Sequence, residues 1–139
     1  MSSSNPVDVV KAAYAAFGRG DVPAIVALCD DKLDWQFNGG TRVPYSGRFG
    51  KADVADWFGA VAEHDDVQVF EPREFIAGGE HVTVIGWERC AARPSGRRFE
   101  CPWVHVFTVK HGKVTRFWGI YDTEASSSAR GAQPKCRRR

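Results

Sequence analysis

The chain has 139 residues, a length at which one domain is the usual organisation and at which a core with one internal pocket can be buried. Its net charge is +2, but the last ten residues carry five basic and no acidic side chains, so the rest holds 14 basic against 17 acidic residues, a net charge of −3. A mildly acidic body argues against a nucleic-acid-binding protein, and no apolar run approaches the roughly 20 residues that span a membrane. The N-terminal segment MSSSNPVDVV lacks the basic and apolar regions of a secretion signal, so we expect a cytoplasmic protein.

Four cysteines are scattered along the chain without a CxxC pair: Cys29, Cys90, Cys101 and Cys136. Reduced, mostly buried thiols are the expectation for a cytosolic protein. Cys90 and Cys101 could face each other across a hairpin, so a disulfide between them stays open as the alternative. No Cys or His spacing is typical of a metal site, and we expect neither a metal nor a cofactor.

The first half of the chain predicts three helices. Asn5 is a good N-cap and Pro6 suits the first turn, so a helix is expected to begin here and to end near Gly18. Asp21 caps a short second helix, and residues 51–64 form the third. The apolar stripe that identifies the first helix comprises Val10, Ala13, Tyr14 and Phe17.

Strands follow the second helix and fill the second half of the chain. Residues 33–38 alternate between apolar and polar side chains, which is typical of a strand with one buried face. Residues 41–50 are expected to be a loop. Later strands, joined by tight turns, are expected over 67–75 (broken by Pro72), 81–92, 97–110 and 113–123. Residues 124–139 lack periodicity and predict a flexible basic tail, which leaves a single domain over 1–123.

Helices that precede a run of strands indicate the α+β class. One antiparallel sheet can bury such helices if it bends around them. The outer face of this sheet also carries large apolar side chains, so we expect a homodimer that forms through it.

Several segments together resemble one family: FGRGD (17–21), LCDDKLDW (28–35), YSGRFGKADVADWF (45–58), FIAGGEHVTVIGWE (75–88) and WVHVFTVKHGKVTRFWGIYD (103–122). In order and spacing, residues 7–123 resemble the SnoaL-like branch of the nuclear transport factor 2-like superfamily, which also contains ketosteroid isomerases. The resemblance implies a cone-shaped α+β barrel, in which three N-terminal helices are wrapped by a strongly curved antiparallel β-sheet around a pocket. The superfamily includes several enzyme classes and noncatalytic proteins, so the fold alone does not give the function.

The resemblance allows the isomerase residues to be carried over. That chemistry uses a carboxylate base, a tyrosine and a protonated aspartic acid. The tyrosine position falls on or beside Ala13, next to Tyr14. The base position falls near Gln36, and the position of the acid falls on His105. Since the base is an amide and the acid a histidine, ketosteroid isomerisation by that mechanism is not expected.

The predicted catalytic residues are His105, Asp122 and Tyr14. His105 alternates with Trp103 and Phe107 on one strand face, so it would lie inside the cone as a neutral imidazole able to give or take a proton. The alternative is a core histidine with a structural hydrogen bond. Asp122 could act as a base or orient the histidine, or it could be a cap or turn residue.

Gln36 is predicted to donate to a substrate carbonyl, and five aromatic residues are predicted to line the site or simply to fill the core: Trp35, Trp57, Trp103, Phe107 and Tyr121. Glu88 could face either the dimer interface or the pocket. We therefore expect a protein that binds a small hydrophobic molecule. It would be a cofactor-independent lyase, isomerase or cyclase, or else a noncatalytic binding or scaffold module.

Overall fold

The computed structural model describes residues 5–131. Its elements, in chain order, are α1 (Pro6–Gly18), α2 (Val22–Ala27), β1 (Cys29–Asn38), β2 (Gly47–Phe49), the 3-10 turn η2 (Lys51–Asp53), α3 (Val54–His64), β3 (Asp65–Gly78), β4 (His81–Ala92), β5 (Arg98–Lys110), β6 (Lys113–Tyr121) and α4 (Thr123–Ala129).

The first two helices begin at the caps predicted from the sequence. The Asn5 side chain accepts a hydrogen bond of 2.9 Å from the Val7 N–H, and the Asp21 carboxylate accepts one of 3.2 Å from the Ala24 N–H. Each satisfies an amide that the first helical turn leaves without a partner. The third helix differs in one detail, because residues 51–53 are a 3-10 turn and α3 begins at Val54.

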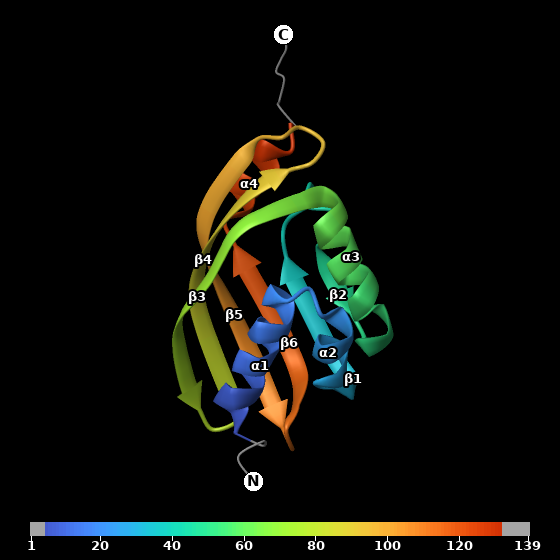
Figure 1. Cartoon of the computed structure of the whole chain (residues 1–139), viewed down its shortest axis with the longest axis vertical. Coiled ribbons are helices and arrows are strands. Elements are labelled where there is room, and N and C mark those ends of the chain that lie inside the picture. The colour runs from blue at the N-terminus through green and yellow to red at the C-terminus, as the bar shows by residue number, and fades with distance from the viewer. Residues whose placement is uncertain (1–4, 132–139) are drawn as a thin grey trace.

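A six-stranded sheet in the order β2-β1-β6-β5-β4-β3 curves around the helices (Figure 1). Helices α1, α2 and α3 lie against its concave face, which confirms the cone-shaped α+β architecture. Neighbouring strands are antiparallel except β1 and β6, which run parallel. A parallel pair is possible here because the connection from β1 to β6 is long and carries α3 and four strands.

Two strands differ from their predicted limits. Residues 47–49 lie in the expected loop but form β2, since Phe49 pairs with Trp35 on β1. Pro72 does not interrupt β3, because a bulge between Pro72 and Glu74 absorbs the irregularity. Strand β3 is also an edge strand, where a residue without an N–H is tolerated.

The expectation of a flexible tail from residue 124 is wrong for residues 124–131. Thr123–Ala129 form α4, whose first turn is capped by Asp122 accepting a hydrogen bond of 3.0 Å from the Ala125 N–H. Only Ser126 and Ala129 of this helix are buried, too few to leave an apolar stripe in the sequence. Residues 132–139 of the expected tail lie outside the described residues.

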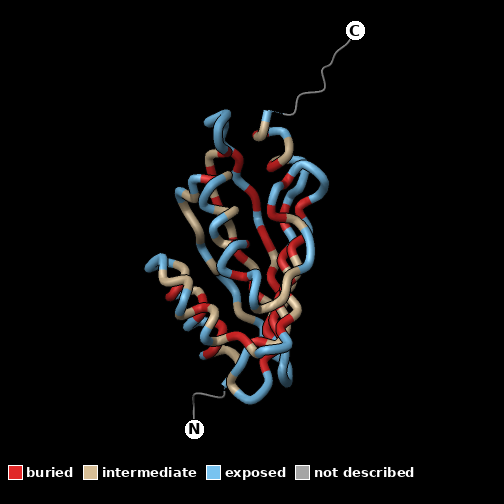
Figure 2. The backbone as a smooth tube through the Cα atoms, turned by 90° about the vertical axis from the view of Figure 1, so that its right-hand side faces the viewer, coloured by how far each residue is buried: buried red, intermediate tan, exposed pale blue. Residues whose placement is uncertain are grey.

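The concave face of the sheet and the facing sides of the helices form the core (Figure 2). At Gly86 on β4, the Trp103 indole of β5 lies so close that an added Cβ would sit 2.3 Å from the ring. Glycine at this point therefore makes room for an aromatic wall. Within residues 5–131, no helix is long and apolar enough to cross a membrane.

Cys29, Cys90 and Cys101 are buried free thiols, as expected. The alternative of a disulfide between Cys90 and Cys101 is therefore wrong. Cys136 lies outside the described residues.

Candidate functional site

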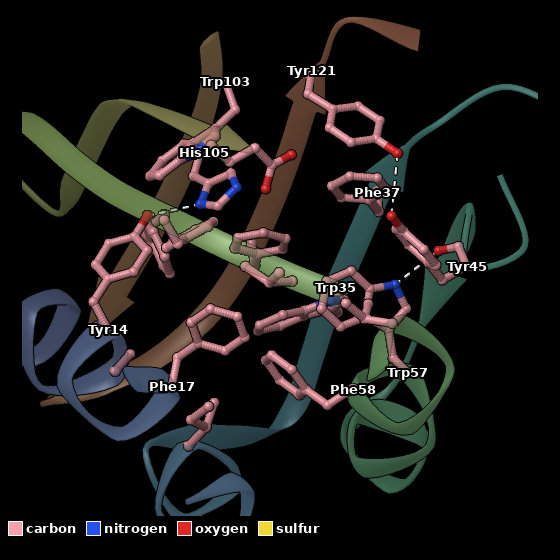
Figure 3. Close-up of a pocket in the computed structure, with 18 of the residues that line it drawn as sticks. Tyr14, Phe17, Trp35, Phe37, Tyr45, Trp57, Phe58, Trp103, His105 and Tyr121 are labelled. Atoms are coloured by element: carbon pink, nitrogen blue, oxygen red, sulfur yellow. Dashed lines mark hydrogen bonds between the residues drawn. The ribbon is translucent and has the colours of Figure 1, made fainter. Parts of the chain in front are cut away.

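A cavity of about 90 Å³ lies between the helices and the concave face of the sheet (Figure 3). Most of its walls are aromatic. Seven residues singled out from the sequence line it: Tyr14, Trp35, Trp57, Trp103, His105, Phe107 and Tyr121. Because these side chains come from α1, α3, β1, β5 and β6, the cavity exists only in the folded chain.

Tyr14 and His105 are joined by a hydrogen bond inside this cavity, with 2.7 Å between the phenol oxygen and the imidazole Nδ1 (Figure 3). The imidazole also stacks on the Trp103 indole, with ring centroids 4.0 Å apart. A neutral histidine and a tyrosine each carry one polar hydrogen, and their mutual bond uses one of the two. The Tyr14–His105 pair therefore keeps one hydrogen for a ligand oxygen in either imidazole tautomer.

Burial holds this pair in its uncharged form. Desolvation lowers the pKa of His105 to about 3 and raises the pKa of Tyr14 well above its usual value. At neutral pH both groups are therefore neutral. Such a neutral pair can donate a hydrogen bond to an oxyanion as negative charge develops on it.

Two of the predicted site residues are not brought to the cavity. Asp122 is exposed and serves as the N-cap of α4, so the prediction of a base at this position is not supported and the alternative of a cap is confirmed. Gln36 lies on β1 between the buried residues Trp35 and Phe37. Its side chain faces the opposite side of the sheet, where it donates to the Asn38 side chain at 3.4 Å.

Glu88 lines the cavity, which settles the orientation that the sequence leaves open. It is 8% exposed. Burial, helped by the negative charge of Asp65, raises the pKa of this carboxyl to about 7. Unlike the Tyr14–His105 pair, this group can exchange a proton at neutral pH.

A buried polar network closes the end of the cavity near α4. Arg130 forms an ion pair with Asp65, with 2.9 Å between the guanidinium and the carboxylate. The Tyr45 hydroxyl donates to Asp65 and lies 3.2 Å from the Tyr121 hydroxyl. Ser126 of α4 joins the network through a 2.7 Å contact with Tyr121 and accepts from Arg130 at 3.0 Å. Sequence reasoning missed this network, because its charged members lie at the start of a strand and in the expected tail.

Two further donors lie in the aromatic walls. The indole nitrogens of Trp35 and Trp103 are buried and have no hydrogen-bond partner among the described residues. A buried N–H without a partner is costly. A ligand acceptor atom in the cavity could satisfy either of them.

A second hollow, of about 330 Å³, adjoins the cavity between the end of α1, the start of α2 and α3. The two spaces share five lining residues: Phe17, Phe58, Val61, Asp65 and Val67. The rings of Phe17 and Phe58 lie 5.9 Å apart and are only partly buried. The hollow therefore shares a wall with the cavity that holds the Tyr14–His105 pair.

Comparisons with known proteins found one matching family model and several solved structures similar to this chain. A family model described as the SnoaL-like domain matches residues 10–117. An NTF2-like protein from Burkholderia xenovorans LB400 is 34% identical, with a TM-score of 0.81 over 89% of this chain and 94% of that one. An NTF2-like protein of unknown function from Burkholderia pseudomallei K96243 is 28% identical, with a TM-score of 0.84 over 93% and 99%. TerC, co-crystallised with polyporic acid, is 25% identical, with a TM-score of 0.78 over 91% and 98%. A comparison with curated proteins found no match.

Proposed function

The chain belongs to the SnoaL-like family of the nuclear transport factor 2-like superfamily, and from this premise we propose that it is a cofactor-independent isomerase, lyase or cyclase acting on a small hydrophobic carbonyl compound. The co-crystallisation of TerC with polyporic acid supports a small organic molecule as the occupant of the cavity. The free buried thiols support a cytoplasmic location.

The observation that carries this proposal is the 2.7 Å hydrogen bond between Tyr14 and His105 within an aromatic cavity. The hydrogen that this pair leaves unused is available to a carbonyl oxygen. When a proton leaves the carbon next to that carbonyl, negative charge develops on the oxygen, and a preformed donor stabilises it. Isomerisation, elimination and aldol cyclisation all pass through such a step.

Exchange of carbon-bound hydrogen tests this chemistry without the natural substrate. In D₂O at pH 7, the protein is expected to accelerate the loss of the α-proton NMR signal of cyclopentanone. His105→Gln is expected to reduce the acceleration roughly tenfold or more, because the donor pair is disrupted. Tyr14→Phe is expected to lower it as well.

His81→Gln is the matched control, since His81 is exposed at the start of β4 and should leave the exchange rate unchanged. Equal rates for the wild type and His105→Gln would contradict a role for the Tyr14–His105 pair. No acceleration by the wild type over a panel of small ketones would count against the enzymatic function as a whole.

A noncatalytic binding protein is the second candidate. The observation that favours it is the position of Asp122 and Gln36, two predicted contributors to catalysis, away from the cavity. Titration of the intrinsic tryptophan fluorescence with small hydrophobic ligands separates the two functions. Saturable quenching without hydrogen exchange or turnover would support binding alone.

We also propose that the protein forms a homodimer through the outer face of the sheet. Cross-strand pairing places Ile85 opposite Val104 and Val104 opposite Ile120, with Val106 and Trp118 beside them. Ile120 is 39% exposed. A contiguous apolar surface on a sheet is typical of a protein–protein interface.

Ile120→Lys is expected to convert this dimer to a monomer, because a charge would be buried within the apolar surface. Light scattering after size-exclusion chromatography measures the mass directly. Ala55→Lys, which adds the same charge at an exposed position of α3, should remain dimeric. A wild-type chain of monomeric mass at micromolar concentration would refute the dimer.

A further inference from the structure

Glu88 is a buried carboxyl group that takes no part in the hydrogen bond between Tyr14 and His105. It lines the cavity, and no Lys, Arg or His within residues 5–131 forms an ion pair with it. Burying a carboxylate without a cationic partner is unfavourable, and glutamine would fill the same space at lower cost. Groups of this kind are concentrated at functional sites.

The position of Glu88 in the sheet brings it to the same aromatic wall as the Tyr14–His105 pair. Glu88 pairs across the sheet with Phe70 on β3. The Phe70 ring stacks on the Trp103 indole at 4.7 Å, and that indole stacks on the imidazole at 4.0 Å. A continuous aromatic stack therefore runs from beside the carboxyl to the donor pair, so a flat ligand lying along it can contact both.

The charged groups around Glu88 leave its carboxyl free to accept a proton, because none of them forms an ion pair with it. The titratable groups around it are Asp65, Cys90, Cys101 and Arg130. Burial and Asp65 raise the pKa of Glu88, whereas the Cys90 thiol and Arg130 lower it. Arg130 is already committed to Asp65 at 2.9 Å. Glu88 is thus ionised in part of the population near neutral pH, with no cation bound directly to it.

We propose that Glu88 is the catalytic base, and that the substrate is a flat or ring-shaped ketone with an acidic C–H next to the carbonyl; this rests on the proposed function. The carboxylate takes the proton, the C–H electron pair forms the C=C bond of an enolate, and the carbonyl π electrons move to the oxygen. That oxygen accepts the free hydrogen bond of the Tyr14–His105 pair. Glu88 then returns the proton to a carbon of the same molecule, so no oxidant or reductant is needed.

Glu88→Gln keeps the shape of the side chain and removes the base. In the cyclopentanone exchange assay at pH 7, this variant is expected to lose the acceleration by roughly tenfold or more while the fluorescence titration still shows binding. Glu88→Asp, which keeps a carboxyl, is expected to fall between the two. Glu100→Gln is the matched control, because Glu100 is exposed on the adjacent strand β5.

Exchange that persists in Glu88→Gln would overturn the role of Glu88 and leave the proposed function intact. A wild type without exchange would instead remove the proposed function, and this inference with it. If Glu88→Gln does not fold, the wild-type rate between pH 5 and 9 decides. The rate should rise through about pH 7 as the carboxyl ionises, and a flat profile would contradict the assignment.

Discussion

Replacing Arg130 with methionine is expected to lower the free energy of unfolding by about 3–5 kcal/mol, because the substitution leaves the Asp65 carboxylate buried without its cation. The side chains of Arg130 and Asp65 are only 7% and 1% exposed, so water cannot take the place of the lost partner. Urea denaturation followed by tryptophan fluorescence measures the change. Loss of the Tyr45 and Ser126 contacts of Arg130 adds to the effect.

Arg48→Met provides the comparison. Arg48 pairs with Asp34 at 2.9 Å, but its side chain is 68% exposed, so Arg48→Met should lower the stability far less than Arg130→Met. The double variant Asp65→Leu with Arg130→Met should be more stable than Arg130→Met alone, since it removes the stranded charge as well. A single variant as stable as the wild type would show that the ion pair is not buried in solution.

His105 is expected to make the protein sensitive to acid. Its pKa is near 6.5 in the unfolded chain and about 3 in the folded protein, so below pH 6.5 the unfolded state binds a proton that the folded state does not. Stability therefore falls as the pH decreases from 6.5 to 3, by up to about 5 kcal/mol over the whole interval. Above pH 6.5 this histidine contributes no pH dependence, because it is neutral in both states.

Comparing wild type and His105→Gln isolates this contribution from that of the carboxylates. The difference between their unfolding free energies should change steadily from pH 6.5 downward, in favour of the variant. Parallel stability curves over pH 4–7 would mean that the imidazole is hydrated and charged in the folded protein. The variant His81→Gln, which replaces an exposed histidine, should follow the wild type.

Local patterns in the sequence predicted most of the fold. The alternation along residues 103–107 predicted that His105 faces inward, and the apolar stripe through Tyr14 predicted that Tyr14 faces the sheet. In the structure the two side chains form a hydrogen bond. The same parity points Gln36 outward, because Trp35 and Phe37 on either side are buried. The prediction that Gln36 lies in the site came from the family resemblance instead. The two-residue period of the strand turns its side chain to the opposite face of the sheet.

The buried charges could not be predicted in the same way. Asp65 follows α3 among other polar residues, and nothing local distinguishes it from the exposed Asp66 beside it. Arg130 belongs to a segment rich in serine and arginine, whose burial depends on a partner far away in the chain. Asp122 was ambiguous for a related reason, since an aspartate before a short helix caps its first turn. Only tertiary contacts distinguish these roles.

The ion pair between Asp65 and Arg130 also orders events during synthesis of the chain. The two residues are separated by 65 positions, which a ribosome adding about 5–20 residues per second covers in roughly 3–13 s. Strands β3 to β6 are all made within that interval and can pair as they emerge, while the aspartate beside them has no cation. The end of the cone near α4 is therefore completed last, and a nascent chain stalled before Arg130 should still present an open barrel to chaperones.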